Sequence, residues 1–160
     1  MKNLMLFSLF LLTLGFFSCS KDAKALKKID GDWKVQNIQF LATDGTSLDV
    51  TPTNAILSIL SCDKKDNQTP NACSMTYTQE GNVSVNFSYQ ISADKDNTNI
   101  SIRDAGNNNA TSDQYINYFK GSNALSFSDK DTKMTMDCIG CQVTINGTTF
   151  TSRIVSLSKK

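Results

Sequence analysis

Cysteine is the residue type with the most chemistry to offer in this chain. The 160 residues include five cysteines and no histidine. The lack of histidine excludes a Ser–His or Cys–His catalytic pair and a zinc site of the usual histidine-containing kind. Cys19 stands apart near the N-terminus. The other four cysteines form an even set, which in an exported protein indicates disulfides with three pairings open: Cys62, Cys73, Cys138 and Cys141.

Cys62 and Cys73 flank a polar stretch between two apolar segments. A bond between them would stabilise the fold by roughly 2–3 kcal/mol, because it closes a loop in the unfolded chain. A zinc site made of all four cysteines is the alternative, but the ten residues between Cys62 and Cys73 are a poor spacing for it.

Cys138 and Cys141 have the spacing of a redox CxxC motif. Such a motif draws its reactivity from a helix N-terminus or from nearby cations. Here it lies between two strand-like segments, 134–137 and 142–145, and Gly140 suits the left-handed position of a tight turn. We therefore interpret the pair as a structural disulfide that joins the two strands leaving this turn.

The acidic residues offer little chemistry by their spacing. Residues 94–99 resemble a calcium loop but lack its glycine at position six and its closing glutamate. Asp30 and Asp32, like Asp129 and Asp131, lie in predicted turns without apolar surroundings that would raise a carboxyl pKa. The sequence therefore predicts no enzyme, no metal site and no cofactor.

The N-terminus has the pattern of an export signal. A cationic start, residues 1–3, precedes an apolar run at 4–17, and the small residue Ser18 stands directly before Cys19. We predict a lipoprotein signal peptide over residues 1–18, cleavage before Cys19 and acylation of its sulfur. Plain secretion is one alternative. A transmembrane anchor is the other, and the run is short of the roughly 20 residues that a spanning helix needs.

The predicted mature chain divides into a lipidated tether or short helix, residues 19–29, and one domain, residues 30–160. An acylated Cys19 would attach this chain to a membrane. The polar residues directly after it partly resemble the export tag of surface lipoproteins in Bacteroidota-type bacteria. We expect a protein of the cell envelope, held at the outer membrane and extending to the cell surface.

Charge and composition exclude some partners. The signal holds one lysine, which leaves 15 basic against 15 acidic side chains in the mature chain. A neutral chain argues against nucleic acid, which calls for a basic stripe, and we expect a monomer. Serine, threonine and asparagine are abundant while glutamate occurs once, at Glu80, and this composition favours strands over long helices.

Alternation of apolar and polar residues predicts strands along the whole domain. The clearest case is 83–91, where every second residue is apolar. Asn146-Gly147 is the best hairpin signal, and a change of apolar parity between Val35 and Ile38 predicts a bulge in the first strand. The ten predicted strands are 33–40, 55–60, 73–79, 83–91, 99–103, 114–119, 124–128, 133–138, 142–145 and 148–157.

Short strands at near-regular spacing, with no convincing helix after residue 30, indicate an all-β fold. We predict an antiparallel up-and-down β-barrel of about 8–10 strands, because closing the sheet removes its exposed edges. A β-sandwich is the alternative. At about eight strands a barrel interior is either filled by side chains or holds one small ligand.

The first strand carries a family resemblance. Gly31-Asp32-Trp33, followed by Asp44-Gly45, resembles the G-x-W opening of lipocalin-like domains found in Bacteroidota-type lipoproteins. The resemblance implies a barrel closed at one end by Gly31 and Trp33, with the tryptophan packed against an arginine near the last strand. Arg153 is the arginine in that place by chain order.

Two functions are weighed for this domain. In the first, the barrel binds a small apolar ligand, lined by the inward-facing residues Met75, Tyr77, Phe87, Tyr89, Tyr118, Phe127, Met134 and Met136. In the second, these side chains fill the barrel, and the loops at 63–71 and 104–112 bind a protein or glycan.

Overall fold

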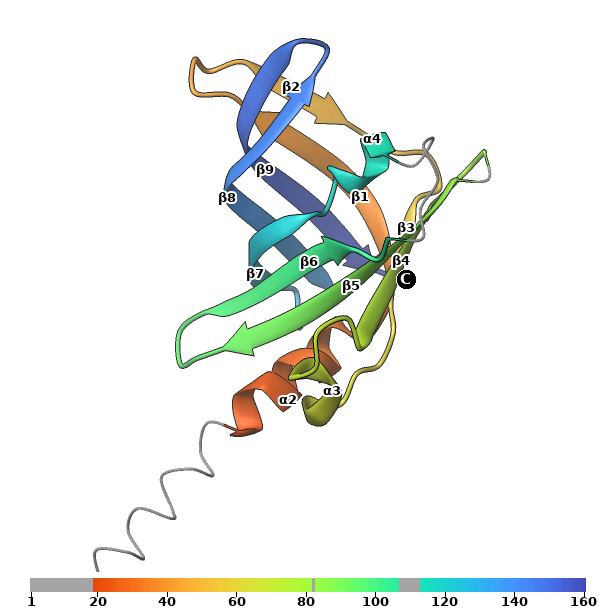
Figure 1. The fold of residues 1–160 in the computed structure, drawn as a ribbon, viewed down its shortest axis with the longest axis vertical. Helices are drawn as coiled ribbons and strands as arrows, with labels where there is room; N and C mark the ends of the chain where they lie inside the picture. Colours follow the sequence, from red (N-terminus) through yellow and green to blue (C-terminus); the bar gives the residue numbers. More distant parts are fainter. Residues whose placement is uncertain (1–18, 82, 107–112) are drawn as a thin grey trace, which may run out of the picture.

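A closed antiparallel β-barrel is the body of the molecule (Figure 1). The computed structural model describes residues 19–81, 83–106 and 113–160, so the predicted signal peptide lies outside the described residues. Each barrel strand pairs with the next, and the last pairs with the first, which is the predicted up-and-down barrel rather than the sandwich. In barrel order the strands are β1 (Gly31–Leu41), β3 (Ile56–Ile59), β4 (Cys73–Gln79), β5 (Val83–Ala93), β6 (Thr98–Asp104), β7 (Gly121–Ser128), β8 (Lys133–Ile145) and β9 (Thr148–Lys159).

β1 pairs with two different strands along one edge because it bends. Its first half pairs with β3, its second half pairs with the additional strand β2 (Ser47–Val50), and β9 runs along its other side. The pairing with β9 shifts between Val35 and Asn37. The predicted bulge is therefore confirmed, and it keeps both Val35 and Ile38 buried in the interior.

The strand predicted at 114–119 is wrong. The chain forms a short helix there, α4 (Asp113–Ile116), followed by a turn in which Lys120 N–H donates to the Ile116 carbonyl at 3.0 Å. Tyr115, Tyr118 and Phe119 are spaced i, i+3 and i+4, which gathers them on one side of a helical turn. In so short a segment this spacing cannot be told from strand alternation.

The expectation of no helix after residue 30 is also wrong at the loop between β3 and β4. That loop holds α3 (Lys64–Asn67), whose first turn is capped by the Asp63 carboxylate accepting from Asp66 N–H at 2.8 Å. The Asn67 side chain exchanges two hydrogen bonds with the backbone of Ile91 in β5. The centre of this loop is thus fastened to the barrel.

The predicted chain reversal at the CxxC motif is wrong as well. β8 continues through it as one strand, and only its pairing with β9 is interrupted, between Ile139 and Val143. Gly140 has a φ of 81°, which a glycine adopts without strain. Because the segments on both sides pair with the same strand, the left-handed glycine produces a bulge rather than a turn.

One end of the barrel is covered by helix α2 (Cys19–Ile29) (Figure 1). Ala25, Leu26 and Ile29 are buried on its inner side. The segment expected as a tether or short helix is thus a helix packed on the domain. Within the described part of the chain, no helix is long and apolar enough to cross a membrane.

Candidate functional site

The end of the barrel opposite α2, called the mouth here, is filled by the connection between β6 and β7. After α4, this connection turns inward and places the Phe119 ring inside the barrel, with no exposed surface. The Phe119 ring centroid lies 5.2 Å from that of Tyr77 and 5.7 Å from that of Phe87. A segment predicted as part of the barrel wall therefore acts as a plug.

Three tyrosines gather at the mouth, and we call them the tyrosine triangle. Tyr77 comes from β4, and Tyr115 and Tyr118 come from α4 and the turn after it. The ring centroids of Tyr77 lie 6.1 Å from those of both Tyr115 and Tyr118, which are 5.5 Å from each other. Tyr77 is buried, while Tyr115 and Tyr118 are half-buried. Three aromatic rings therefore meet at a partly open surface.

Two phenylalanines extend this aromatic surface toward β1 and β9. The Phe40 ring centroid lies 6.1 Å from that of Tyr118 and 5.8 Å from that of Phe150. Such tilted ring pairs stabilise a core beyond the area that they bury. The rings of the tyrosine triangle are thus backed by buried phenylalanines.

The Tyr77 and Tyr118 hydroxyls of the tyrosine triangle are uncharged at neutral pH. Burial, and next to it the neighbouring Tyr118 and Tyr115, raise the pKa of Tyr77 far above its usual value. Burial and Tyr115 raise the pKa of Tyr118. The Tyr77 hydroxyl already donates to the Gln79 side-chain oxygen. The triangle can therefore offer neutral donors and acceptors to a bound molecule.

Arg153 of β9 holds the plug in place. Its guanidinium is fully buried and donates to the backbone oxygens of Asn117, Phe119 and Lys120 and to the Asn123 side-chain oxygen, over 2.6–3.1 Å. Burial lowers the pKa of Arg153 to about 10. A planar fork with five donors suits several backbone oxygens at once.

The expected contact between Trp33 and Arg153 is wrong. The pairing of β1 with β9 sets Trp33 opposite Lys159, whereas Arg153 lies opposite Phe40. Trp33 is buried at the α2 end, where its indole N–H donates to the Ile29 carbonyl at 2.6 Å and the Lys159 ammonium lies 5.2 Å from its ring centre. The tryptophan and the arginine are separated because Lys159, the β9 residue opposite Trp33, lies six residues from Arg153 along the strand.

The eight residues predicted to line a ligand cavity fall into two groups. Six of them are at most 2% exposed and fill the barrel: Met75, Tyr77, Phe87, Tyr89, Met134 and Met136. The other two residues are half-buried and lie at opposite ends of the barrel. Tyr118 is at the mouth, while Phe127 is at the α2 end, where its ring centroid lies 5.0 Å from the Lys28 ammonium. Of the eight, Tyr77 and Tyr118 belong to the tyrosine triangle.

Tyr115 and Phe119 were missed as site residues, as were Phe40 and Phe150. The sequence carried one usable signal for the first two, the dense aromatic run from Tyr115 to Phe119. Strand alternation assigned that run to the barrel wall. A tight turn was needed to bring its rings together, and no glycine or proline within the run announces one.

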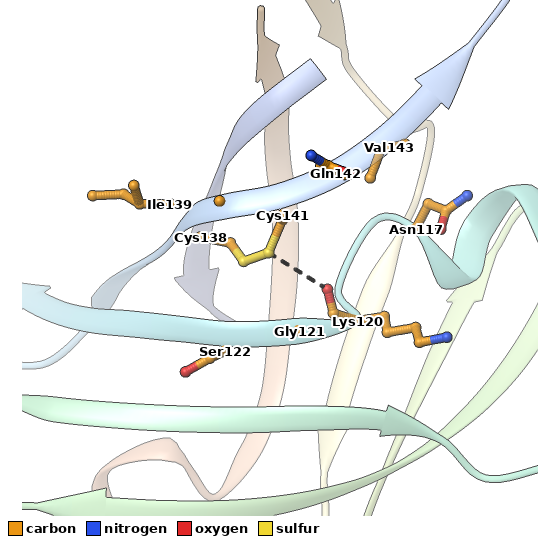
Figure 2. A pocket seen from close by; sticks show the side chains of 10 residues that line it. Asn117, Lys120, Gly121, Ser122, Cys138, Ile139, Cys141, Gln142 and Val143 are labelled. Carbon is orange, nitrogen blue, oxygen red and sulfur yellow. Dashed lines mark hydrogen bonds between the residues drawn. A yellow bond between two sulfur atoms is a disulfide. The ribbon is translucent and has the colours of Figure 1, made fainter. Parts of the chain in front are cut away.

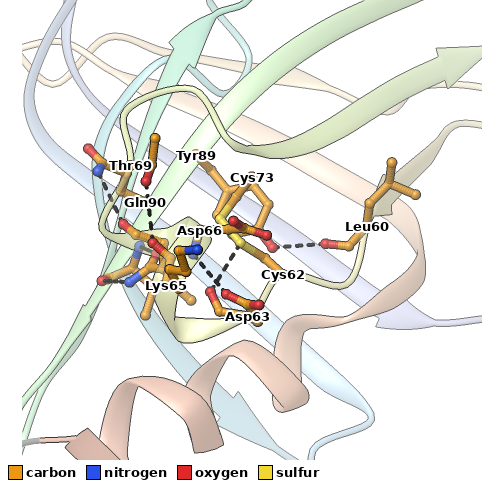
Figure 3. The surroundings of a disulfide bond; sticks show 11 residues. Leu60, Cys62, Asp63, Lys65, Asp66, Thr69, Cys73, Tyr89 and Gln90 are labelled. Carbon is orange, nitrogen blue, oxygen red and sulfur yellow. Dashed lines mark hydrogen bonds between the residues drawn. A yellow bond between two sulfur atoms is a disulfide. The ribbon is translucent and has the colours of Figure 1, made fainter.

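Both disulfides expected from the cysteine count are present, as Cys62–Cys73 and Cys138–Cys141. The first closes the loop that holds α3, next to the Tyr89 hydroxyl, which donates to the Leu60 carbonyl at 2.9 Å (Figure 3). The second lies in the bulge of β8 (Figure 2). In the described part of the chain, no group of three or more histidine, cysteine, aspartate or glutamate residues is placed to hold a metal ion.

The fold and the mouth together define an antiparallel β-barrel with one covered end and one aromatic end. No protein-family model matches the chain, and no curated protein matches it. Among solved structures it is similar to a lipocalin-like protein from Bacteroides uniformis, with a TM-score of 0.44 and 15% identity over 83% of this chain and 99% of that chain. These values are too low to add to what the strand pairing itself shows.

Proposed function

We propose that this protein is a membrane-anchored lipoprotein whose barrel binds a small, mainly apolar molecule at its aromatic mouth. The tyrosine triangle is the observation that carries the proposal. It brings three tyrosine rings together, two of them half-buried, and each ring carries one hydroxyl group. Binding sites for small molecules are typically apolar with a few such polar groups. The proposal is one of binding and not of catalysis.

The packing below the mouth limits the size of the molecule. Phe119 lies under the tyrosine triangle. Between the triangle and the α2 end of the barrel, methionines and aromatic residues are buried against one another. A ligand would therefore rest on the rings rather than enter deeply. A flat, mostly apolar molecule with one hydrogen-bonding group fits such a surface best, because it stacks on the rings and reaches a tyrosine hydroxyl.

The membrane part of the proposal rests on residues 1–19. The cationic start, the apolar run and Ser18 before Cys19 support cleavage and acylation at that cysteine. A protein anchored in this way at the outer membrane would act as a monomer on molecules that reach the cell envelope. Its mature chain carries no excess of basic residues that would attract nucleic acid.

Mass spectrometry of exported protein tests the binding proposal. Residues 20–160, produced by periplasmic export, should carry extra mass in native spectra that disappears on denaturation. The neutral apolar probe N-phenyl-1-naphthylamine should bind at one site per chain. Removing both half-buried rings, in a Tyr115→Ala and Tyr118→Ala double variant, should weaken the probe by about tenfold or more, since each stacked ring contributes on the order of 1 kcal/mol.

Tyr89→Phe is the matched control, because Tyr89 lies at the α2 end of the barrel and not at the mouth. It should bind the probe as the unchanged protein does. The proposal would be contradicted if the double variant bound the probe as well as the unchanged protein does and native spectra showed no retained mass.

A second function, a filled barrel that binds a protein or glycan through its surface, is favoured by one observation. The lower barrel is packed with buried side chains, and Ile139 is 84% exposed next to the mouth. Of the two loops expected to act, 63–71 is fastened to β5 through Asn67, and residues 107–112 of the other lie outside the described residues. A mouth that binds neither probe nor native ligand would favour this function.

A further inference from the structure

The Cys138–Cys141 disulfide lies in an open recess beside the mouth. The recess has a volume of about 370 Å³ and is bordered by the bulge of β8 and the start of β7 (Figure 2). Cys138 faces the interior and is buried, while Cys141 is half-buried and Gly140 is exposed. Cys141 is therefore the more exposed cysteine of the pair.

Gly121 gives the two sulfur atoms their space. A Cβ atom at this position would lie 2.7 Å from Cys141 Sγ and 3.1 Å from Cys138 Sγ, and the φ of 122° also disfavours other residues. The disulfide thus packs directly on the backbone of β7. This is the same short stretch of backbone that Arg153 holds through the Phe119 and Lys120 carbonyls.

Arg153 and the disulfide meet at one oxygen atom. The Lys120 carbonyl oxygen accepts a hydrogen bond from Arg153 Nη1 at 3.1 Å and lies 3.9 Å from Cys141 Sγ. Arg153 is also the direct pairing partner of Cys138 across the β8–β9 ladder. Arg153 therefore lies across the ladder from one cysteine of the pair and shares an acceptor with the other.

The positive charge of Arg153 has no negative charge among the acceptors of its hydrogen bonds. These acceptors are three backbone oxygens and one amide oxygen, and its Nε is buried without a partner among the described residues. A buried charge is costly unless an opposite charge accompanies it. A cysteine thiolate at this place would supply that opposite charge.

We propose that the Cys138–Cys141 disulfide is a redox-active site that exchanges with the paired thiols of a dithiol substrate, and that Arg153 stabilises the cysteine thiolate that forms. The spacing of a redox CxxC motif and a nearby cation are the two features that make such a cysteine pair reactive. The cation comes from the neighbouring strand β9, and the residues directly beside the motif, which indicated an inert disulfide, do not include it.

The exchange proceeds in two steps. A thiolate of the substrate bonds to the sulfur of Cys141, the more exposed cysteine, the disulfide breaks, and its electron pair leaves on Cys138 as a thiolate beside Arg153. The second substrate thiolate then attacks the substrate sulfur in the mixed disulfide and releases Cys141, which takes up a proton. The substrate dithiol is oxidised to a disulfide by two electrons, the cysteine pair is reduced, and one of the two substrate protons goes to solvent.

The Cys62–Cys73 disulfide is an internal control within the same chain. Cys73 is buried at the α2 end of the barrel, where the α3 loop closes over the bond (Figure 3). Its Cys62 sulfur contacts the Asp63 carbonyl. It should behave as an ordinary structural disulfide.

Equilibration with glutathione buffers, followed by alkylation and mass spectrometry, tests the proposal on the unchanged protein. We expect Cys138–Cys141 to open at a ratio of reduced to oxidised glutathione about tenfold or more below that needed for Cys62–Cys73, because a neighbouring charge shifts such an equilibrium by at least that factor. In the reduced protein, a pH titration of the ultraviolet absorbance of the thiolate, which needs no reagent to reach the buried Cys138, should show a thiol that ionises below the ordinary thiol pKa of about 8.5. Equal resistance of the two disulfides, or an unshifted thiol pKa, would overturn the proposal.

Two substitutions assign the effect to the charge. Arg153→Met should remove the low-pH ionisation of the thiol and make the two disulfides open at similar glutathione ratios. Arg103→Met, at the other arginine, which is exposed on β6, should change neither property. If Arg153→Met does not fold, Arg153→Lys retains the charge and should keep a lowered thiol pKa. The pH profile of the unchanged protein decides the outcome even when neither variant folds.

Discussion

At the scale of single residues, the buried tyrosines and Arg153 show how the barrel treats polar groups. Each buried hydroxyl finds a partner within its own neighbourhood, as Tyr77 does at Gln79 and Tyr89 at the Leu60 carbonyl. The two terminal nitrogens of Arg153 donate to the oxygens of the plug. Some of these partners are distant in the sequence, since Leu60 is 29 residues from Tyr89 and Phe119 is 34 residues from Arg153. The residue types were visible in advance, but their partners were not.

Ionisation of Tyr89 should make the stability of the protein depend on pH. Burial, and next to it Asp30, raise the pKa of Tyr89 to about 12 in the folded protein. An unfolded tyrosine ionises near pH 10, so the unfolded state loses protons that the folded state keeps. The free energy of unfolding should therefore be at its full value below pH 10 and fall as the pH rises from 10 toward 12.

Denaturant unfolding at pH 9 and pH 11 checks this, with Tyr89→Phe as the comparison. The variant should be less stable at pH 9 by about 1 kcal/mol, because it lacks the hydrogen bond to Leu60. Its stability should fall less between the two pH values than that of the unchanged protein. An equal fall in both proteins would contradict the raised pKa.

At the scale of elements, the sequence predicted what depends on alternation and missed what depends on tertiary contact. β4 has the predicted bounds, and the bulge in β1 was visible from a change of parity. The plug at α4 was not visible, because its rings are spaced for a helical turn and a strand alike. The bulge at Gly140 was mistaken for a turn, since only the shared partner β9 distinguishes the two. The candidate site was accordingly half predicted: Tyr77 and Tyr118 were chosen, and Tyr115 was not.

Helix α2 should contribute to the stability of the domain, because it covers one end of the barrel core. Leu26 is 4% exposed there, and the Asp22 carboxylate accepts from Ala93 N–H at 2.7 Å. Leu26→Ala should lower the free energy of unfolding by roughly 2–5 kcal/mol, and Asp22→Asn by about 1 kcal/mol because the acceptor loses its charge. Both are measured by denaturant unfolding.

Lys24→Ala is the control on the same helix, since Lys24 is exposed. It should change the stability by less than about 0.5 kcal/mol. If Leu26→Ala were as mild as this control, α2 would be a loosely attached tether and not part of the domain.

At the scale of the whole molecule, α2 determines how the barrel would stand on a membrane. The helix begins at Cys19, the proposed site of acylation, and Asp22 on its first turn accepts a hydrogen bond from the barrel. Three residues of helix span only about 4.5 Å, so little free chain separates the acyl groups from the barrel. The α2 end would face the lipid and the mouth would face away from it. A ligand of the mouth would then arrive from the aqueous side rather than from the bilayer.

Hydrogen–deuterium exchange on the acylated protein in lipid nanodiscs tests this orientation. The turns at the α2 end, residues 94–97 and 129–132, should exchange more slowly than in the lipid-free Cys19→Ser protein, because headgroups lie over them. The mouth turn at 146–147 should exchange equally in both, since the up-and-down order places it at the far end. Protection of the mouth turn instead would reverse the orientation and make the bilayer the source of the ligand. If neither end differs in exchange between the acylated and the lipid-free protein, the barrel does not rest on the membrane. In that case α2 detaches from the barrel when the protein is anchored.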